Sequence, residues 1–186
     1  MSSILESHPI EMTPLWLNEL KGEWTAHVSI YQYCPQQVDD ARIIIPIRAK
    51  DLTPAWLNKQ LEALPSGSEL ALHSELINKN KKLHIPMIDF SQPTKPSEEN
   101  LSWIEKHSNL KFNIYESGRS YHGYGEKLLT HDEWIKFMGL LLLASAPGTI
   151  SIVDTRWIGH RLIAGYAALR WSKNTQQYLK SPTRII

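Results

Sequence analysis

The order of sequence patterns after residue 83 most constrains what this 186-residue chain can fold into. Three segments have the β-branched and aromatic content that is typical of strands: Leu83–Phe90, Leu110–Tyr115 and Ser120–Tyr124. A polar segment follows the first of them, and Ser97 is placed to cap a helix that runs through His107. These patterns predict a β-α-β-β order.

The next patterns add a second helix and a fourth strand. Thr130-His131-Asp132-Glu133 forms a capping box, in which the Thr and Glu side chains satisfy each other's backbone N–H groups, and it opens a helix that continues to Ala144. Pro147-Gly148 ends that helix, and the apolar segment Thr149–Val153 is typical of a buried strand. A last helix is expected from about Arg156 to Trp171.

The complete β-α-β-β-α-β order predicts an α+β fold, with a ferredoxin/RRM-like split βαβ over about residues 69–172. Its first strand is preceded by another, Glu69–Ile77. The first half of the chain has two Thr-Pro helix starts and two strand patterns, Thr25–Tyr33 and Ala41–Ile47. We therefore expect residues 1–68 to form an N-terminal αβ unit that packs on residues 69–186 within one compact domain.

Composition excludes several classes of protein. Hydrophobic residues make up 42% of the chain and charged residues 21%, which is enough for a packed core and argues against a disordered chain. The single cysteine, Cys34, excludes an intramolecular disulfide and a zinc site with several cysteines. It also fits a reducing cytoplasm, where we expect the protein. The most apolar stretch, residues 137–153, is broken by Pro147, so no membrane span is expected.

Charge is distributed unevenly along the chain. Residues 117–186 hold nine Lys/Arg and four Asp/Glu, whereas residues 1–116 hold eleven and fifteen, for a net charge of +1. A basic half beside an acidic half is compatible with a local anion site. A chance imbalance of surface charge explains the same numbers equally well.

Three of the expected strands carry polar residues that folding does not require. Asp89 lies at the end of an apolar strand, Ser120 and His122 share one face of theirs, and Asp154 follows Val153. In a split βαβ the strand of Asp89 and the strand of His122 lie side by side, while the strand of Asp154 lies at an edge. Two acids with a Ser/His pair on one sheet face would form a site for a divalent metal ion and phosphate.

Basic residues flank two of these positions. Arg119 precedes Ser120, and Arg156 and His160 share a helix face at i and i+4, with Arg161 beside them. Near a helix N-terminus such a face suits phosphate. A solvated basic surface is the structural alternative.

Each acid and the histidine also has a structural alternative. Asp89 is placed to cap a turn and Asp154 to cap the last helix. His122 is placed to pack between Tyr121 and Tyr124 as a strand histidine that is bonded to the backbone.

An acid-bearing strand, a Ser-x-His strand and an apolar strand that ends in Asp resemble, in this order, the three-motif signature of archaeo-eukaryotic primases and primase-polymerases. The motifs here are Met87-Ile88-Asp89-Phe90-Ser91, Ser120-Tyr121-His122 and Val153-Asp154. The resemblance covers roughly residues 69–172, which would form the palm of that family. It implies nucleotide or nucleic-acid partners, other replication or repair proteins, and nucleotidyl transfer.

The resemblance also implies roles for the candidate residues. Asp89, His122 and Asp154 would be catalytic, and the two acids would hold Mg²⁺ or Mn²⁺. The residues expected to bind the nucleotide's phosphates are Arg119, Ser120, Arg156, His160 and Arg161.

The chain departs from the family pattern at the first motif. The family has two acids two residues apart, whereas here only Asp89 is acidic, and its partner position is Met87 or Ser91. Two carboxylates can hold one ion together with phosphate oxygens, but a two-metal clamp is harder to assemble. We therefore expect either a divergent primase-polymerase-like protein with weak or lost transfer activity, or an inactive nucleic-acid-binding or scaffold module. A third alternative is an unrelated ferredoxin-like protein whose polar strand ends are structural.

Overall fold

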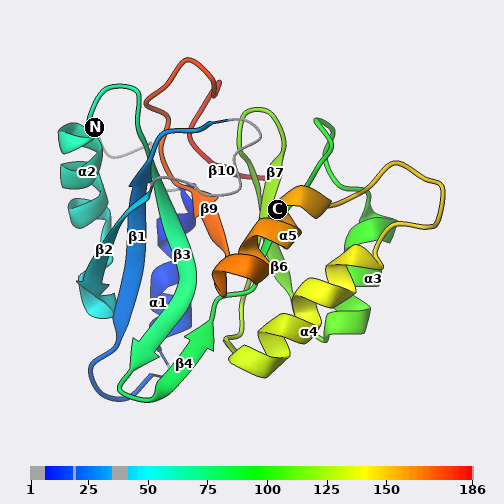
Figure 1. Cartoon of the computed structure of the whole chain (residues 1–186), viewed down its shortest axis with the longest axis horizontal. Coiled ribbons are helices and arrows are strands. Elements are labelled where there is room, and N and C mark those ends of the chain that lie inside the picture. Colours follow the sequence, from blue (N-terminus) through cyan, green and yellow to red (C-terminus); the bar gives the residue numbers. More distant parts are fainter. Residues whose placement is uncertain (1–6, 19, 35–41, 186) are drawn as a thin grey trace.

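The computed structural model describes residues 7–18, 20–34 and 42–185, which form two antiparallel sheets with helices around them (Figure 1). The first sheet has the order β2-β1-β3-β4-β8, and β9 pairs with β3. Its strands are β1 (Thr25–Tyr31), β2 (Arg42–Arg48), β3 (Glu69–Asn78), β4 (Lys81–His84), β8 (Leu129–Thr130) and β9 (Ala168–Arg170). The expected strand start at Ala41 lies outside the described residues.

The second sheet has the order β10-β6-β7-β5. Its strands are β5 (Met87–Asp89), β6 (Phe112–Glu116), β7 (Tyr121–Gly125) and β10 (Thr183–Arg184). The α-helices are α1 (Thr13–Leu17), α2 (Pro54–Ala63), α3 (Glu98–Ser108), α4 (His131–Leu142) and α5 (Thr155–Ala164), and two 3₁₀ turns span Pro9–Met12 and Ala49–Asp51. The helices α3, α4 and α5 gather on one side of the molecule (Figure 1). The predicted α+β class is confirmed, and the assignment of a palm stays a prediction.

The strand of Asp89 and the strand of His122 are neighbours, as expected. They pair antiparallel, and Asp89 lies directly opposite His122 in the register of β5 and β7. The capping box at the start of α4 is also confirmed, because the Thr130 and Glu133 side chains each bond the other's backbone N–H group. Local sequence signals therefore placed these elements correctly.

The single strand expected over Leu83–Phe90 is wrong, because this segment passes from one sheet to the other. Up to Ile85, whose N–H donates to the Ser74 carbonyl, it bonds β3 of the first sheet. From Pro86, whose carbonyl accepts from the Gly125 N–H, it bonds β7 of the second sheet. Proline has no N–H to continue the first ladder, which explains why the change of sheet occurs here.

The predicted strand Thr149–Val153 is also wrong, except at its last residue. Val153 forms an isolated bridge with Phe90, while Ile150 is 78% exposed. The Thr149 N–H donates to the Ala146 carbonyl instead of to a neighbouring strand. The segment after Pro147-Gly148 is therefore mostly a turn that leads into α5.

The last helix ends at Ala164 and not at Trp171. Gly165 adopts the left-handed conformation at φ +79° and ends the helix, which is the usual role of glycine at this position. The apolar residues that follow form β9, in which Leu169 pairs with Leu72 of β3. The helical prediction failed because a short apolar run fits a buried strand as well as a helix.

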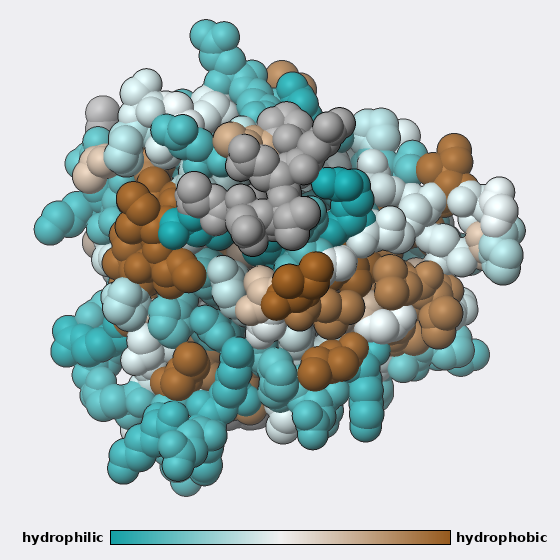
Figure 2. Space-filling view, in the orientation of Figure 1, coloured by the Kyte–Doolittle hydropathy of each residue, from teal (hydrophilic) through white to brown (hydrophobic). Residues whose placement is uncertain are grey.

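The core lies between the sheets and the helices and is rich in aromatic side chains. Trp171 is fully buried, and its indole N–H donates to the Tyr124 hydroxyl at 3.1 Å, which links the end of β9 to β7 of the other sheet. Exposed apolar side chains form patches over β2 and over α4 and α5 (Figure 2). Their members include Ile43, Ile44, Leu143 and Ile163. No helix among the described residues is long and apolar enough to cross a membrane.

Gly125 is expected to be intolerant of any side chain. A Cβ atom there would lie 2.8 Å from both Cβ and Cγ of Pro86, at the point where the chain changes sheets. The ring of Pro86 cannot swing away, so Gly125→Ala should lower the free energy of unfolding by about 1–3 kcal/mol. Gly139→Ala is the matched control, because Gly139 lies inside α4 with nothing within 4 Å of such a Cβ. That change should stabilise the protein by up to about 1 kcal/mol. Equal urea midpoints for the two variants would contradict this account.

Candidate functional site

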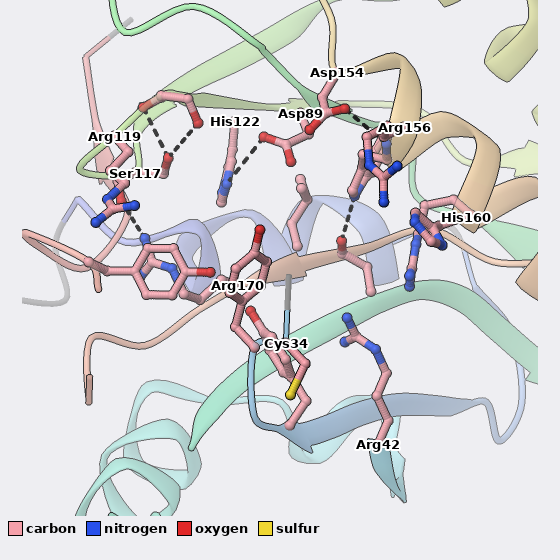
Figure 3. Close-up of a pocket in the computed structure, with 18 residues that line it drawn as sticks. Cys34, Arg42, Asp89, Ser117, Arg119, His122, Asp154, Arg156, His160 and Arg170 are labelled. Atoms are coloured by element: carbon pink, nitrogen blue, oxygen red, sulfur yellow. Dashed lines mark hydrogen bonds and ion pairs between the residues drawn. The ribbon is translucent and has the colours of Figure 1, made fainter. Parts of the chain in front are cut away.

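A cavity of about 220 Å³ lies between the two sheets and beside α5 (Figure 3). Its walls come from β1, β2 and β9 of the first sheet, from β5, β7 and the β6–β7 turn of the second, and from α5 and the C-terminal segment. All eight candidate residues line it: Asp89, Arg119, Ser120, His122, Asp154, Arg156, His160 and Arg161. The structure thus brings them together, while their chemical roles stay predictions.

Asp89 and His122 face each other across the pairing of β5 and β7. The distance from His122 Nε2 to Asp89 Oδ1 is 3.8 Å, and the histidine is only 6% exposed. Its Nδ1 atom has no hydrogen-bond partner among the described residues. Burial, assisted by the charge of Arg170, lowers the pKa of His122 to about 3. His122 is therefore a neutral imidazole at physiological pH.

The environment of Asp89 opposes its ionisation. Burial and, next, the nearby charge of Asp154 raise the pKa of Asp89 to about 8, although Arg170 and Arg161 act in the opposite direction. At pH 7 the carboxyl group is therefore largely protonated, and it can donate a hydrogen bond as well as accept one.

Asp154 lies directly beside Asp89. Its backbone N–H donates to the Asp89 carbonyl at 2.8 Å, so the two residues are held next to each other by the main chain. Its side chain caps α5, because Oδ1 accepts from the Trp157 N–H at 3.0 Å. Asp154 therefore both caps α5 and lines the cavity.

The donor set does not fit a two-metal centre. Met87, one of the two positions that could have carried the second acid, is fully buried and lies opposite Tyr124 in the sheet. The Ser91 hydroxyl, at the other position, donates to the Ser151 carbonyl. Within residues 7–18, 20–34 and 42–185, no three His, Cys, Asp or Glu side chains form a group that could hold a metal ion.

Two arginines that the sequence analysis missed complete the cavity. Arg42 reaches it from β2, on the side opposite Asp89, and Arg170 reaches it from β9 (Figure 3). Arg170 is 4% exposed and donates to the carbonyls of Ser117 and Ser172, and its guanidinium lies 3.9 Å from the centre of the Tyr178 ring. Within the described part of the chain, the Nε atom of Arg170 has no hydrogen-bond partner and no carboxylate forms an ion pair with its guanidinium.

A sequence signal for Arg170 existed. It is a charged residue within the apolar run Ala167-Ala168-Leu169-Arg170-Trp171, which is the same kind of signal that identified Asp89. The expected helix over this run obscured it. Arg42 carried no such signal. It reaches the cavity through the pairing of β2 with β1, a contact between separate segments that no local pattern predicts.

A family model described as archaeo-eukaryotic primase 1D-like matches residues 48–183, which is well over half of the chain. The chain belongs to this family. Comparison with curated proteins gave no match, and comparison with solved structures gave none either. The resemblance seen in the three motifs is thereby confirmed at the level of the primase superfamily.

The region matched by the family model does not include every residue that lines the cavity. The matched region contains all eight candidate residues and Arg170, but Arg42 and the cavity residues of β1 precede it. Part of the cavity wall in this primase 1D-like protein is therefore built by residues outside the matched region.

Proposed function

We propose that this primase 1D-like protein binds the phosphate groups of a nucleotide, either free or at the end of a nucleic-acid strand, in the cavity between its sheets. The observation that carries this proposal is the convergence of five arginines on one cavity of about 220 Å³: Arg42, Arg119, Arg156, Arg161 and Arg170. The guanidinium group presents a planar set of donors that matches phosphate oxygens and stays charged at all relevant pH values.

The charge balance of the cavity favours an anionic ligand. Among the described residues that line the cavity, five carry a guanidinium group and two, Asp89 and Asp154, carry a carboxyl group, and the pKa of Asp89 is raised. His122 adds no charge, but its buried imidazole can bond a ligand through a ring nitrogen. The family supports a role that involves nucleotides or nucleic acid, and a phosphate is the group common to both.

The arrangement of α5 supports the same ligand. Arg156 and His160 lie at i and i+4 in its first turns, and both line the cavity. Arg119, from the turn between β6 and β7, lies across the cavity from them (Figure 3). A phosphate group between α5 and this turn would therefore meet cations on two sides.

Binding, and not nucleotidyl transfer, is the function that these observations favour. We expected nucleotidyl transfer in this superfamily to use acids that hold metal ions. In this chain the position of the second acid of the first motif is occupied by Met87 or Ser91. Neither residue offers the carboxylate oxygen that Mg²⁺ prefers. A primer-extension assay with Mg²⁺ and Mn²⁺ tests this choice directly, and template-dependent extension would favour the enzyme over the binding protein.

The binding proposal predicts a salt-dependent affinity that requires phosphate. In calorimetry, a nucleoside triphosphate and a 5′-phosphorylated oligonucleotide test the two sources of phosphate, and the unphosphorylated nucleoside serves as the negative ligand. Raising the salt concentration from about 50 to 200 mM should weaken binding roughly tenfold or more, since several cations contact the phosphates. A flat response to salt, or equal affinity for the nucleoside, would contradict a phosphate site.

Arg156→Ala and Arg48→Ala form a matched pair for this measurement. Both side chains are exposed, so neither change should unfold the protein, but only Arg156 lines the cavity. Loss of one charge-assisted hydrogen bond should weaken binding by about tenfold in Arg156→Ala. Arg48→Ala should bind as the wild type does.

A further inference from the structure

We infer that the cavity binds its phosphate ligand without a divalent metal ion, and that arginine side chains supply the positive charge that a metal ion would bring. This inference rests on the proposed function and states how that function works. It concerns the residues of this chain, whose donor set differs from the one that the primase resemblance implied.

The three motifs offer a metal ion two carboxyl groups, Asp89 and Asp154, and their other oxygen ligands are absent or already engaged. Asp154 Oδ1 accepts the hydrogen bond that caps α5, and the Ser91 hydroxyl is held by the Ser151 carbonyl. Met87 carries no oxygen and is buried against the second sheet. A hard cation such as Mg²⁺ takes about six oxygen ligands, so beyond these two carboxyl groups its ligands would have to come from water and from the nucleotide.

A divalent cation would also enter a space that is lined by five arginine side chains. The five arginines come from β2, the β6–β7 turn, α5 and β9, so they surround the cavity and do not lie on one side of it. Like charges repel strongly where water is partly excluded. The same arrangement attracts a phosphate from every side.

Arg170 shows most clearly what the cavity is built to receive. It is nearly buried and lines the cavity, and among the described residues carbonyl groups hold its guanidinium, while Glu69 and Asp89 act on it only from beyond ion-pair distance. A buried cation is unfavourable until an anion compensates it. A ligand phosphate would provide that compensation, whereas a metal ion would add to the unfavourable charge.

The experiment compares nucleotide binding to the full chain with and without divalent cations. Calorimetric titration with a nucleoside triphosphate in EDTA should give an affinity at most about threefold weaker than that measured with Mg²⁺ or Mn²⁺, because the metal-free nucleotide carries the full negative charge of its phosphates. Binding that is lost in EDTA and restored by Mn²⁺ would overturn the inference and leave the proposed function intact. No binding under either condition would overturn both.

Asp154→Asn separates the two mechanisms by the sign of its effect. Asparagine also caps helices well, so α5 should be retained. If the cavity binds phosphate directly, removal of this carboxylate charge should leave binding unchanged or tighten it by up to about tenfold, since one repulsive charge is lost and easier ionisation of Asp89 offsets part of that loss. If Asp154 holds a metal ion that binds the nucleotide, the same change should weaken binding at least tenfold. Asp132→Asn, at an exposed position in the first turn of α4 and outside the cavity, is the control and should leave the affinity unchanged.

Discussion

A change from pH 7 to pH 5 is expected to lower the free energy of unfolding by about 5 kcal/mol. Four histidines are buried in the folded protein, and burial lowers the pKa of His8 to about 4 and the pKa values of His73, His84 and His122 to about 3. In the unfolded chain each has a pKa near 6.5. The unfolded state therefore takes up protons between pH 7 and pH 5 that the folded state cannot bind.

The sign of the effect follows from the direction of each shift. A lowered histidine pKa gives stability that is present above pH 6.5 and is lost as the pH falls, by about 2 kcal/mol for each histidine at pH 5. Asp89 acts in the opposite direction, because its raised pKa lets the folded protein gain a proton below pH 8. Its contribution over the same interval is about 3 kcal/mol, which leaves the net loss stated above.

Urea unfolding at pH 7, 6 and 5 measures this loss, and His73→Phe provides the matched variant. Both ring nitrogens of His73 lack hydrogen-bond partners among the described residues, and its ring stacks on Tyr166 with centroids 4.2 Å apart. Phenylalanine should keep the stacking and remove the titrating group. Between pH 7 and pH 5 the free energy of unfolding of the variant should therefore fall by about 2 kcal/mol less than that of the wild type. Equal urea midpoints for the wild type at the two pH values would show that the histidines are not held neutral.

Arg170→Ala is expected to impair both folding and binding. The guanidinium donates to the carbonyls of Ser117, Ser172 and Lys180, and it therefore ties β9 to the β6–β7 turn and to the C-terminal segment. Removal of the guanidinium leaves these carbonyls without a donor. Each carbonyl that stays buried and unpaired costs about 1–3 kcal/mol, so we expect the free energy of unfolding to fall by about 3 kcal/mol. Nucleotide affinity should fall by about a hundredfold, because a buried charged donor is lost from the lining of the cavity.

Arg170→Lys distinguishes the charge from the shape of the group. Lysine keeps the positive charge but cannot reproduce a fork of donors that spans two carbonyls and a ligand. This variant should therefore recover part of the binding, about tenfold over the alanine variant, with little gain in stability. Urea unfolding and calorimetry on the same samples give both quantities. Wild-type affinity in Arg170→Ala would exclude this residue from the ligand site.

The candidate site was more predictable from sequence than the fold around it. Asp89, His122 and Asp154 stood out because a polar group at the end of an apolar strand has no role in forming that strand, and all three line the cavity. The convergence of Asp89 and His122 required only the expected neighbour relation of two strands, which the pairing of β5 with β7 confirms, whereas Asp154 reaches them through an isolated bridge and not through a predicted strand pairing. Local pattern and strand alternation were sufficient for that step.

What sequence could not predict depends on contacts between distant segments. Arg42 reaches the cavity only because β2 pairs with β1, and β1 in turn pairs with β3. Arg170 was placed in a helix because the pattern of β9 is too short to identify its partner, although Gly165 marked the end of α5. The segment after Pro147 was apolar enough for a strand, but the Val153 bridge with Phe90 is isolated.

The passage of one segment from the first sheet to the second at Pro86 has a consequence for how the cavity meets its ligand. Lys81–His84 and Met87–Asp89 belong to different sheets but are joined by only two residues, both of them buried. A short covalent link with a rigid proline ring thus limits how far β5, which carries Asp89, can move from the first sheet. Less ordering of the sheets then opposes binding, and the two sheets present their polar groups at a spacing that selects among anionic ligands.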